Sequence, residues 1–418
     1  MKYKVPVTTC LLLLIVMSVS LFTGCSKQRV QQVDLPITPP KPEYARELGV
    51  DEKALIKLTA GQWPDLLPLL NQPNQFDLEK ALKRSLAWFA TPSSRNHYPL
   101  AQITHQQAHA SVLAMLNMIQ PVDLEKIKQQ FELYQSVGCD GQGTVLFTGY
   151  YSPIFKASLT QTQKFKYPLY RKPLDLISDP VSGNVLGRKQ ADGSIVAYYS
   201  RQEIEEKQVL AGLELVWLAD PFDVYLVHIQ GSARLELTDG SVMHVGYAGT
   251  NGHAYQSVAR QLVADGLLDK NSLNLPAIEK FFMDHPQELS PRLAHNSRYV
   301  FFAKYEPQAW PSGSMGFQVT PGVSIATDKS IFPRGGPTLI HVPMTRYDGT
   351  LQKQMRLMVD QDTGGAIRAP GRSDIYYGVG QVAQMRAGYQ LAQGQLYYLF
   401  LKPEYVSQWT QRLSMPQQ

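Results

Sequence analysis

Two aspartates stand twelve positions apart in the segment Asp362-Thr-Gly-Gly-Ala-Ile-Arg-Ala-Pro-Gly-Arg-Ser-Asp374-Ile-Tyr-Tyr-Gly378. Glycine carries no Cβ, so the Gly-Gly pair near Asp362 lets a ligand approach the backbone closely. The Ile-Tyr-Tyr run after Asp374 favours a strand, which would hold that carboxylate on a sheet. Two carboxylates beside a bound ligand can act as general acid and general base. This segment is therefore the first candidate for a catalytic site.

Other chemical interpretations of the sequence are weaker. Asp362-Thr-Gly resembles the aspartic-protease triplet, but that chemistry needs two aspartates that share a proton, and the triplet occurs once. Gly378-Val-Gly-Gln-Val-Ala383 resembles a dinucleotide fingerprint without the βαβ unit that should follow it. His-Glu-x-x-His, Cys-x-x-Cys and Gly-x-Ser-x-Gly do not occur. We therefore expect no cofactor and no metal site, and we interpret His228 and His244 as structural.

The start of the chain predicts export and lipidation. Residues 1–24 combine two early lysines, a short apolar run and small residues before Cys25, as a signal peptide does. Leu21-Phe-Thr-Gly-Cys25 resembles a bacterial lipobox, with Phe22 in place of the more usual Leu, and predicts that Cys25 carries acyl chains such as palmitate. The alternative is an ordinary cleaved signal with an incidental cysteine. Ser26 in place of Asp favours the outer membrane of a Gram-negative host, with the protein at its periplasmic face, and residues 25–42 form a Pro-rich tether.

Composition agrees with an exported enzyme. The 418 residues are enough for two domains with sizeable cores. The net charge is +5, and removing residues 1–24 removes two lysines and no acids, which leaves +3 and gives no argument for a nucleic-acid partner. Of the three cysteines, Cys10 lies in the signal and Cys25 would be lipidated. Only Cys139 remains, so we expect no intramolecular disulfide and interpret it as a small buried hydrophobe.

Periodicity predicts helices first and strands afterwards. The pattern from about 52 to 135 is helical, most clearly over 77–89, with Asp77 as a candidate cap, and over 106–118. Another helix is expected over 254–268. Short apolar segments separated by Gly and Pro turns predict strands and a closed barrel; they are 144–152, 224–229, 233–237, 242–247, 297–302, 323–326, 338–342, 357–359, 375–377 and 396–401.

Six motifs occur in one order along the chain. They are Phe147-Thr-Gly-Tyr-Tyr-x-Pro153, Val227-His-Ile-Gln-Gly-Ser232, Gly246-Tyr-Ala-Gly-Thr-Asn-Gly-His-Ala-Tyr255, Ser297-Arg-Tyr-Val-Phe-Phe302, Ile325-Ala-Thr-Asp-Lys-Ser330 and the Asp362–Gly378 segment. Together they resemble the membrane-bound lytic murein transglycosylase A family over roughly residues 140–400. The resemblance implies a mainly β fold with N-terminal helices: a double-psi β-barrel domain, an inserted smaller β-domain and a substrate groove between them. The barrel domain would span 43–152 plus 297–418, with a three-aspartate region at about 320–400, and the insert 153–296.

The resemblance also assigns roles to residues. Asp374 corresponds to the family's single catalytic acid, Asp362 to a residue that lines the groove, and Thr148 to a contact near the scissile bond. Asp328 falls at the third aspartate, where we favour a structural turn. Sugar-ring contacts are expected from tyrosines and glycan hydrogen bonds from polar residues of the insert; the candidates are Tyr150, Tyr151, Tyr247, Tyr255, Gln230, Ser232 and Asn251.

The implied reaction cleaves the β-1,4 bond between N-acetylmuramic acid and N-acetylglucosamine in peptidoglycan and leaves 1,6-anhydromuramic ends. One acid suffices, because the sugar's own C6 hydroxyl attacks C1. Asp374 should then have a raised pKa, through burial or through the charge of Asp362. The alternatives are a hydrolase with Asp362 as base and a glycan-binding lipoprotein without catalysis. Peptidoglycan strands are the expected partner, cell-wall synthesis or division proteins are candidate partners, and a monomer is expected.

Overall fold

The computed structural model describes residues 43–179, 183–269 and 273–413, so the expected signal peptide, Cys25 and the tether to residue 42 lie outside the described residues. The α-helices of the described part are α1 (Gln75–Phe89), α2 (His105–Leu116), α3 (Leu124–Gln130), α4 (Arg201–Lys207), α5 (Pro221–Gln230), α6 (Val258–Ala264), α7 (Leu275–Asp284), α8 (Leu289–His295), α9 (Gln381–Tyr389) and α10 (Pro403–Leu413). Short 3-10 helices cover Ala60–Gln62, Leu67–Asn71, Pro92–His97, Pro286–Glu288 and Pro307–Ala309. No helix among the described residues has both the length and the apolar character that a membrane span requires.

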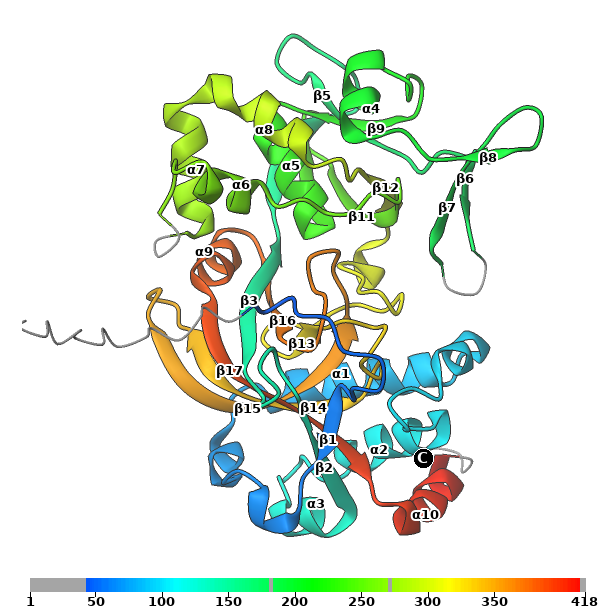
Figure 1. Ribbon diagram of the computed structural model, residues 1–418, viewed down its shortest axis with the longest axis vertical. Coiled ribbons are helices and arrows are strands. Elements are labelled where there is room, and N and C mark those ends of the chain that lie inside the picture. The colour runs from blue at the N-terminus through cyan, green and yellow to red at the C-terminus, as the bar shows by residue number, and fades with distance from the viewer. Residues whose placement is uncertain (1–42, 180–182, 270–272, 414–418) are drawn as a thin grey trace, which may run out of the picture. The chain divides into compact units, whose positions relative to one another are not determined.

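Six strands close into a barrel. In ring order they are β17 (Leu391–Leu401), β14 (Pro337–Thr345), β15 (Leu351–Asp362), β13 (Ser324–Ala326), β16 (Arg372–Val379) and β3 (Val145–Ser152), and β3 pairs again with β17 to complete the ring. The pairs β13–β15 and β16–β3 are parallel. Two further strands, β1 (Leu55–Lys57) and β2 (Phe131–Ser136), extend the sheet from β17. The expected fold class, a mainly β chain with a barrel and N-terminal helices, is confirmed (Figure 1).

A second sheet of six strands follows β3 along the chain. Its order is β12 (Val300–Tyr305), β11 (Val242–Thr250), β10 (Ser232–Leu237), β4 (Ile154–Ser158), β9 (Glu214–Leu218) and β5 (Tyr167–Tyr170). A separate small sheet consists of β6 (Leu176–Ser178), β7 (Val185–Lys189) and β8 (Ile195–Val196). Helices α5 to α8 lie with the second sheet in Figure 1. Because β12 pairs there, we move the proposed end of the insert from residue 296 to the end of β12.

Helices of the N-terminal region pack on the barrel. The buried side chains Leu78, Leu82 and Phe89 of α1 belong to the same apolar core as Val359 of β15 and Leu399 of β17. The spacing of the three α1 residues puts them on one helical face, which is why the periodicity identified this helix. The expected cap is corrected, because α1 starts after Asn74 and Asp77 lies in its first turn.

Two other expectations about secondary structure are wrong. The helical pattern assigned to 52–135 also contains β1 and β2, which pair with each other and with the barrel. The segment 224–229 was expected as a strand but lies inside α5. Asp220 accepts a hydrogen bond from the Phe222 N–H at 2.8 Å, a proline follows it, and Gly231 ends the helix with φ of 75°. These start and stop signals outweigh the strand preference of the apolar side chains between them.

Candidate active site

The barrel places Asp362 and Asp374 on either side of Ala326. Ala326 of β13 pairs with Asp362 on β15 and with Asp374 on β16. Asp374 in turn pairs with Thr148 on β3. A row therefore runs across four neighbouring strands from Asp362 to Thr148, although these residues come from three separate parts of the sequence.

Asp374 is buried without a complete set of partners. Its side chain is 18% exposed, and the nearest cation is Arg372, whose Nη2 lies 3.9 Å from Asp374 Oδ1. The same nitrogen donates a hydrogen bond to Thr148 Oγ1 at 3.0 Å. Oδ1 of Asp374 accepts no hydrogen bond from any residue that the structure describes. Burial raises the pKa of Asp374 to about 6; the charge of Arg372 opposes this rise and the charge of Asp362 adds to it.

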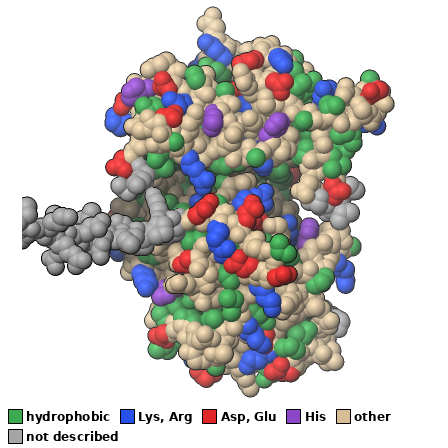
Figure 2. Space-filling model, viewed as in Figure 1, with side chains coloured by type: hydrophobic (Ala, Val, Ile, Leu, Met, Phe, Trp, Pro, Cys, Tyr) green, Lys and Arg blue, Asp and Glu red, His purple; other side chains and the backbone are tan. Residues whose placement is uncertain are grey.

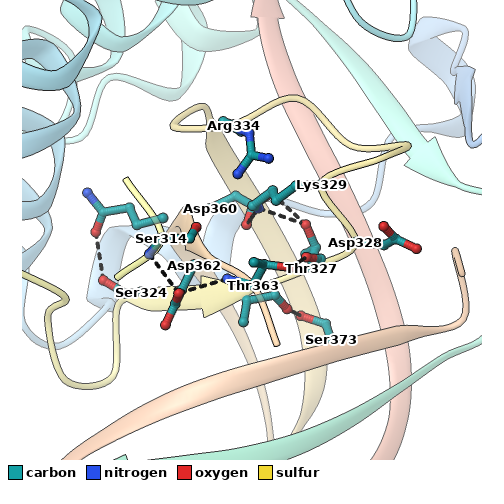
Figure 3. Close-up of polar contacts among 12 residues, drawn as sticks. Ser314, Ser324, Thr327, Asp328, Lys329, Arg334, Asp360, Asp362, Thr363 and Ser373 are labelled. Carbon is teal, nitrogen blue, oxygen red and sulfur yellow. Dashed lines mark hydrogen bonds and ion pairs between the residues drawn. The ribbon is translucent and has the colours of Figure 1, made fainter. Parts of the chain in front are cut away.

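Asp362 is held by three donors. Its Oδ1 accepts hydrogen bonds from the backbone N–H groups of Ser314 and Thr363, both at 2.8 Å, and its Oδ2 accepts one from the Tyr150 hydroxyl at 2.8 Å. Figure 3 shows the two backbone bonds converging on this carboxylate. Burial raises the pKa of Asp362, whereas these hydrogen bonds and the positive charge of Lys329 oppose the rise. The three bonds favour the ionised form, which can accept but not donate.

One glycine makes part of this arrangement possible. A Cβ added at Gly313 would lie 2.7 Å from the Gln361 carbonyl oxygen, closer than real Cβ contacts allow. A side chain here would push the loop away from β15, and the Ser314 N–H would lose its position against Asp362. The loop of 311–319 thus depends on Gly313 to reach the carboxylate.

A cavity of about 470 Å³ lies beside Asp362, within the usual range for small-molecule pockets. Its lining comes from both sheets: the barrel contributes Tyr150, Asp362 and Tyr376, and the second sheet with its helices contributes Gln230 and Ser232. The molecule is hollowed between these two parts in Figure 2, where acidic and basic side chains border the hollow. Asp374 is not among the lining residues; it lies across Ala326 from Asp362, which does line the cavity.

Comparisons with known proteins identify the family of this chain. The model of the MltA specific insert domain matches residues 146–303, and that of the 3D domain matches residues 323–400. The membrane-bound lytic murein transglycosylase A of Escherichia coli K12 is 32% identical over 278 residues, which cover 65% of this chain and 70% of that protein. The Vibrio cholerae protein of the same name is 32% identical over 269 residues, covering 63% and 68%. The chain belongs to the membrane-bound lytic murein transglycosylase A family.

Solved structures agree with this membership of the MltA family. A membrane-bound lytic murein transglycosylase from Agrobacterium tumefaciens has a TM-score of 0.69 at 25% identity, covering 85% of this chain and 99% of its own. The structure of Escherichia coli MltA with bound chitohexaose has a TM-score of 0.65 at 26% identity, covering 87% and 97%. The latter protein binds a linear amino-sugar oligomer in the same fold.

The insert residues that were expected to bind glycan differ in how many of their hydrogen-bonding groups already have partners within the protein. Gln230 accepts a hydrogen bond from the Tyr151 N–H at 3.0 Å through Oε1, and Ser232 Oγ lies 2.7 Å from Ser152 Oγ. Both line the cavity. Asn251 is 2% exposed, and its amide bonds the backbone of Tyr199, Ser297 and Tyr299 at 2.8 to 2.9 Å. Asn251 therefore holds the loop in place and has little left to offer a sugar.

Among the expected tyrosines, Tyr150, Tyr247 and Tyr255 line the cavity, whereas Tyr151 is buried outside it. The Tyr150 ring lies 5.0 Å from that of Tyr376 at a tilt of 46°, so it already packs against another aromatic side chain.

Asp328 has the structural position expected for it. One of its carboxylate oxygens accepts hydrogen bonds from the backbone and hydroxyl of Ser330 at 3.0 and 2.6 Å, and the other accepts one from the Ala369 N–H at 2.9 Å. Ala369 has φ of 68°, so Asp328 fixes a strained point of the loop that joins Asp362 to Asp374.

Sequence reasoning missed a buried ion pair beneath the site. Lys329 and Asp360 are both nearly inaccessible and contact each other (Figure 3). Asp360 also accepts hydrogen bonds from Thr327 at 2.7 Å and Tyr398 at 2.6 Å. The only available signal was Asp360 itself, two positions before Asp362 in the same strand. No group of histidines, cysteines or acids within the described residues could hold a metal ion.

Proposed function

We propose that Asp374 is the single general acid and general base of this chain and that Asp362 holds the site beside it. The contrast between two neighbouring carboxylates carries this proposal. Asp374 has a pKa raised to about 6 and an oxygen without a hydrogen bond from any described group, whereas both oxygens of Asp362 accept hydrogen bonds. A carboxyl group that holds its proton up to about pH 6 and has a free oxygen suits proton donation in mildly acidic to neutral solution.

As a member of the MltA family the chain is a lytic transglycosylase. It cleaves the β-1,4 bond between N-acetylmuramic acid and N-acetylglucosamine in peptidoglycan and leaves 1,6-anhydromuramic ends. Such a reaction consumes no water, so it needs no second catalytic carboxylate.

In the proposed mechanism the proton of Asp374 passes to the glycosidic oxygen, and the bond from that oxygen to C1 breaks. The charge of Asp362 favours the positive, oxocarbenium-like centre that forms. The C6 hydroxyl of the same sugar then attacks C1, and its proton passes to the Asp374 carboxylate, which restores the starting acid. The attack is intramolecular, so part of the entropic barrier is removed in advance.

The remaining substrate contacts are proposed from the hydrogen-bond donors that each side chain does not already use within the protein. Thr148 Oγ1 accepts from Arg372 and keeps its own proton to donate to a sugar oxygen. Gln230 keeps its amide NH₂, because its hydrogen bond to Tyr151 uses the oxygen. Tyr150 acts through Asp362, and Ser232 supports the wall of the groove. We withdraw Asn251 as a glycan contact and propose a structural role for it.

Digestion of purified sacculi in water enriched in ¹⁸O tests the reaction type. The expected products are muropeptides with 1,6-anhydro ends and no incorporated ¹⁸O. Reducing ends that carry ¹⁸O would instead support a hydrolase with Asp362 as the base that activates water.

The location is a separate proposal. The family is membrane-bound by name, and we propose that acyl chains on Cys25 anchor this chain at the periplasmic face of the outer membrane after removal of residues 1–24. The Cys25→Ser variant should then move from the outer-membrane fraction to the soluble fraction on cell fractionation. If it stays with the outer membrane, the anchor is elsewhere.

A further inference from the structure

Arg298 is a cation of the cavity wall that has no anionic partner. It lies two residues before β12 and lines the cavity together with Asp362. Its backbone bonds Asn296 and Arg201, but its guanidinium forms no hydrogen bond or ion pair with any residue that the structure describes. Its five guanidinium N–H donors are thus without an acceptor among the described residues.

The loop after Asp362 is shaped to meet this guanidinium. A Cβ added at Gly365 would lie 3.1 Å from Cζ and Nε of Arg298, so the glycine allows the loop to lie against the charged group. Gly365 is three residues beyond Asp362. The guanidinium is therefore placed on the catalytic side of the cavity, next to the segment that carries both aspartates.

The charges that line the cavity do not balance. Three arginines line it, and Asp362 is the one acidic residue among its described lining residues. Asp362 already accepts three hydrogen bonds, and Arg201 pairs with Glu205 at 3.0 Å. Arg368 lies 3.6 Å from Asp328, with its side chain 58% exposed. Arg298 is left with its charge uncompensated inside the groove.

The surroundings of Arg298 make its charged form less stable. Burial lowers the pKa of Arg298, and the nearby charge of Arg368 lowers it further, while Tyr247 opposes the change. Arginine nevertheless stays protonated in proteins, so the desolvation of this charge is not offset by any anionic group among the described residues. A carboxylate would offset it and would suit the planar guanidinium, which binds such groups through two parallel hydrogen bonds.

We propose that Arg298, assisted by Arg368, binds a carboxylate of the glycan substrate. The carboxylate belongs either to the 3-O-lactyl group of a peptide-free muramic residue or to the peptide attached to that group. This assignment rests on the proposed function and adds to it a preference for carboxylate-bearing strands over neutral chito-oligosaccharides.

Binding measurements with matched ligands test the proposal. The full chain carries Asp374→Asn so that the strands are not consumed, and the ligands are chitohexaose, peptide-free glycan strands and stem-bearing strands. Adding Arg298→Gln should weaken binding of at least one carboxylate-bearing ligand by about tenfold or more, because a charge-assisted hydrogen bond is lost. Binding of chitohexaose should change less than twofold. A loss confined to peptide-free strands identifies the lactyl carboxylate, and a loss confined to stem-bearing strands identifies the peptide.

A control variant separates a specific loss from a general effect of charge. Arg171 directly follows β5 and is not among the residues that line the cavity. Its guanidinium donates only to the Gly212 carbonyl among the described residues, so Arg171→Gln should bind all three ligands as the parent does. Equal weakening of chitohexaose and of both kinds of strand by Arg298→Gln, or no weakening of any, would overturn the proposal. Cleavage of strands by the Asp374→Asn parent would contradict the proposed mechanism. The carboxylate subsite would still be tested by the change in affinity that Arg298→Gln causes for each of the three ligands.

Discussion

Replacing Arg372 with glutamine should extend the activity of the enzyme to higher pH. The Arg372 charge holds down the pKa of Asp374, which burial has raised to about 6. A general acid must be protonated to act, so the alkaline limb of kcat/KM follows its pKa. Without the neighbouring cation, Asp374 should keep its proton to a higher pH.

The size of the change follows from the separation of the charges. Arg372 Nη2 lies 3.9 Å from Asp374 Oδ1, and the two side chains are 14% and 18% exposed. At this separation the attraction is about 1 kcal/mol at the dielectric constant of water and about 4 kcal/mol at an effective value of about 20. Since about 1.4 kcal/mol corresponds to one pKa unit, the smaller figure alone raises the Asp374 pKa by roughly 0.7 unit.

The assay is the pH dependence of kcat/KM for release of anhydromuropeptides from sacculi. Arg372→Gln should move the alkaline limb upward by roughly 0.7 pH unit or more, even if kcat falls through loss of the hydrogen bond to Thr148. Arg372→Lys keeps the charge and should leave the limb near its original position. A limb that stays in place in Arg372→Gln, or moves to lower pH, would refute the assignment of Asp374 as the acid.

Three further predictions concern Asp362, the buried Lys329–Asp360 pair and an acidic residue in the first turn of α5. Asp362→Asn should lower kcat/KM by about 10- to 100-fold without abolishing turnover, and should move the alkaline limb to lower pH because the charge that raises the Asp374 pKa is lost. Lys329→Met leaves Asp360 as an unpaired buried charge and should reduce the free energy of unfolding by about 3 to 5 kcal/mol in urea titrations; an unchanged midpoint would contradict the ion pair. Burial raises the pKa of Asp223 from 3.8 to about 7, so its contribution to stability is fully present below pH 3.8 and is lost as the pH rises through 7. Asp223→Asn should therefore stabilise the protein at pH 8 by about 1 to 2 kcal/mol, after discounting for partial exposure, and should have less effect at pH 5.

The sequence was enough to predict the segment that carries the two aspartates, because glycines and a β-type run flank them. It was not enough to predict their neighbour. Ala326, which pairs with both, comes from a three-residue strand far earlier in the chain, and pairing over such a separation leaves no local pattern. The unequal hydrogen bonding of the two carboxylates depends on this pairing and on the loop that brings Ser314 to Asp362.

Residue type alone did not separate binding groups from supporting groups. Asn251 and Gln230 are both amides followed by a glycine. The Asn251 side chain bonds backbone groups, whereas Gln230 lines the cavity and keeps its NH₂ donors. The sequence did not identify Arg298 as a binding residue. The reason for proposing it is that no acidic side chain pairs with it among the described residues, and only the tertiary structure shows this. The misassigned strand at 224–229 has a local cause: the prediction followed the apolar run, whereas the capping signals at Asp220 and Gly231 decide the structure.

The central claim is that one carboxyl group performs both proton transfers, and a side-by-side measurement of two variants tests it most directly. Asp374→Asn and Asp362→Asn are compared for release of anhydromuropeptides from sacculi, with binding of chitohexaose as the check that each variant folds. Asp374→Asn should give no detectable product and retain binding, whereas Asp362→Asn should retain measurable turnover. If Asp362→Asn abolishes product and Asp374→Asn does not, the roles of the two aspartates are reversed and the proposed mechanism is wrong.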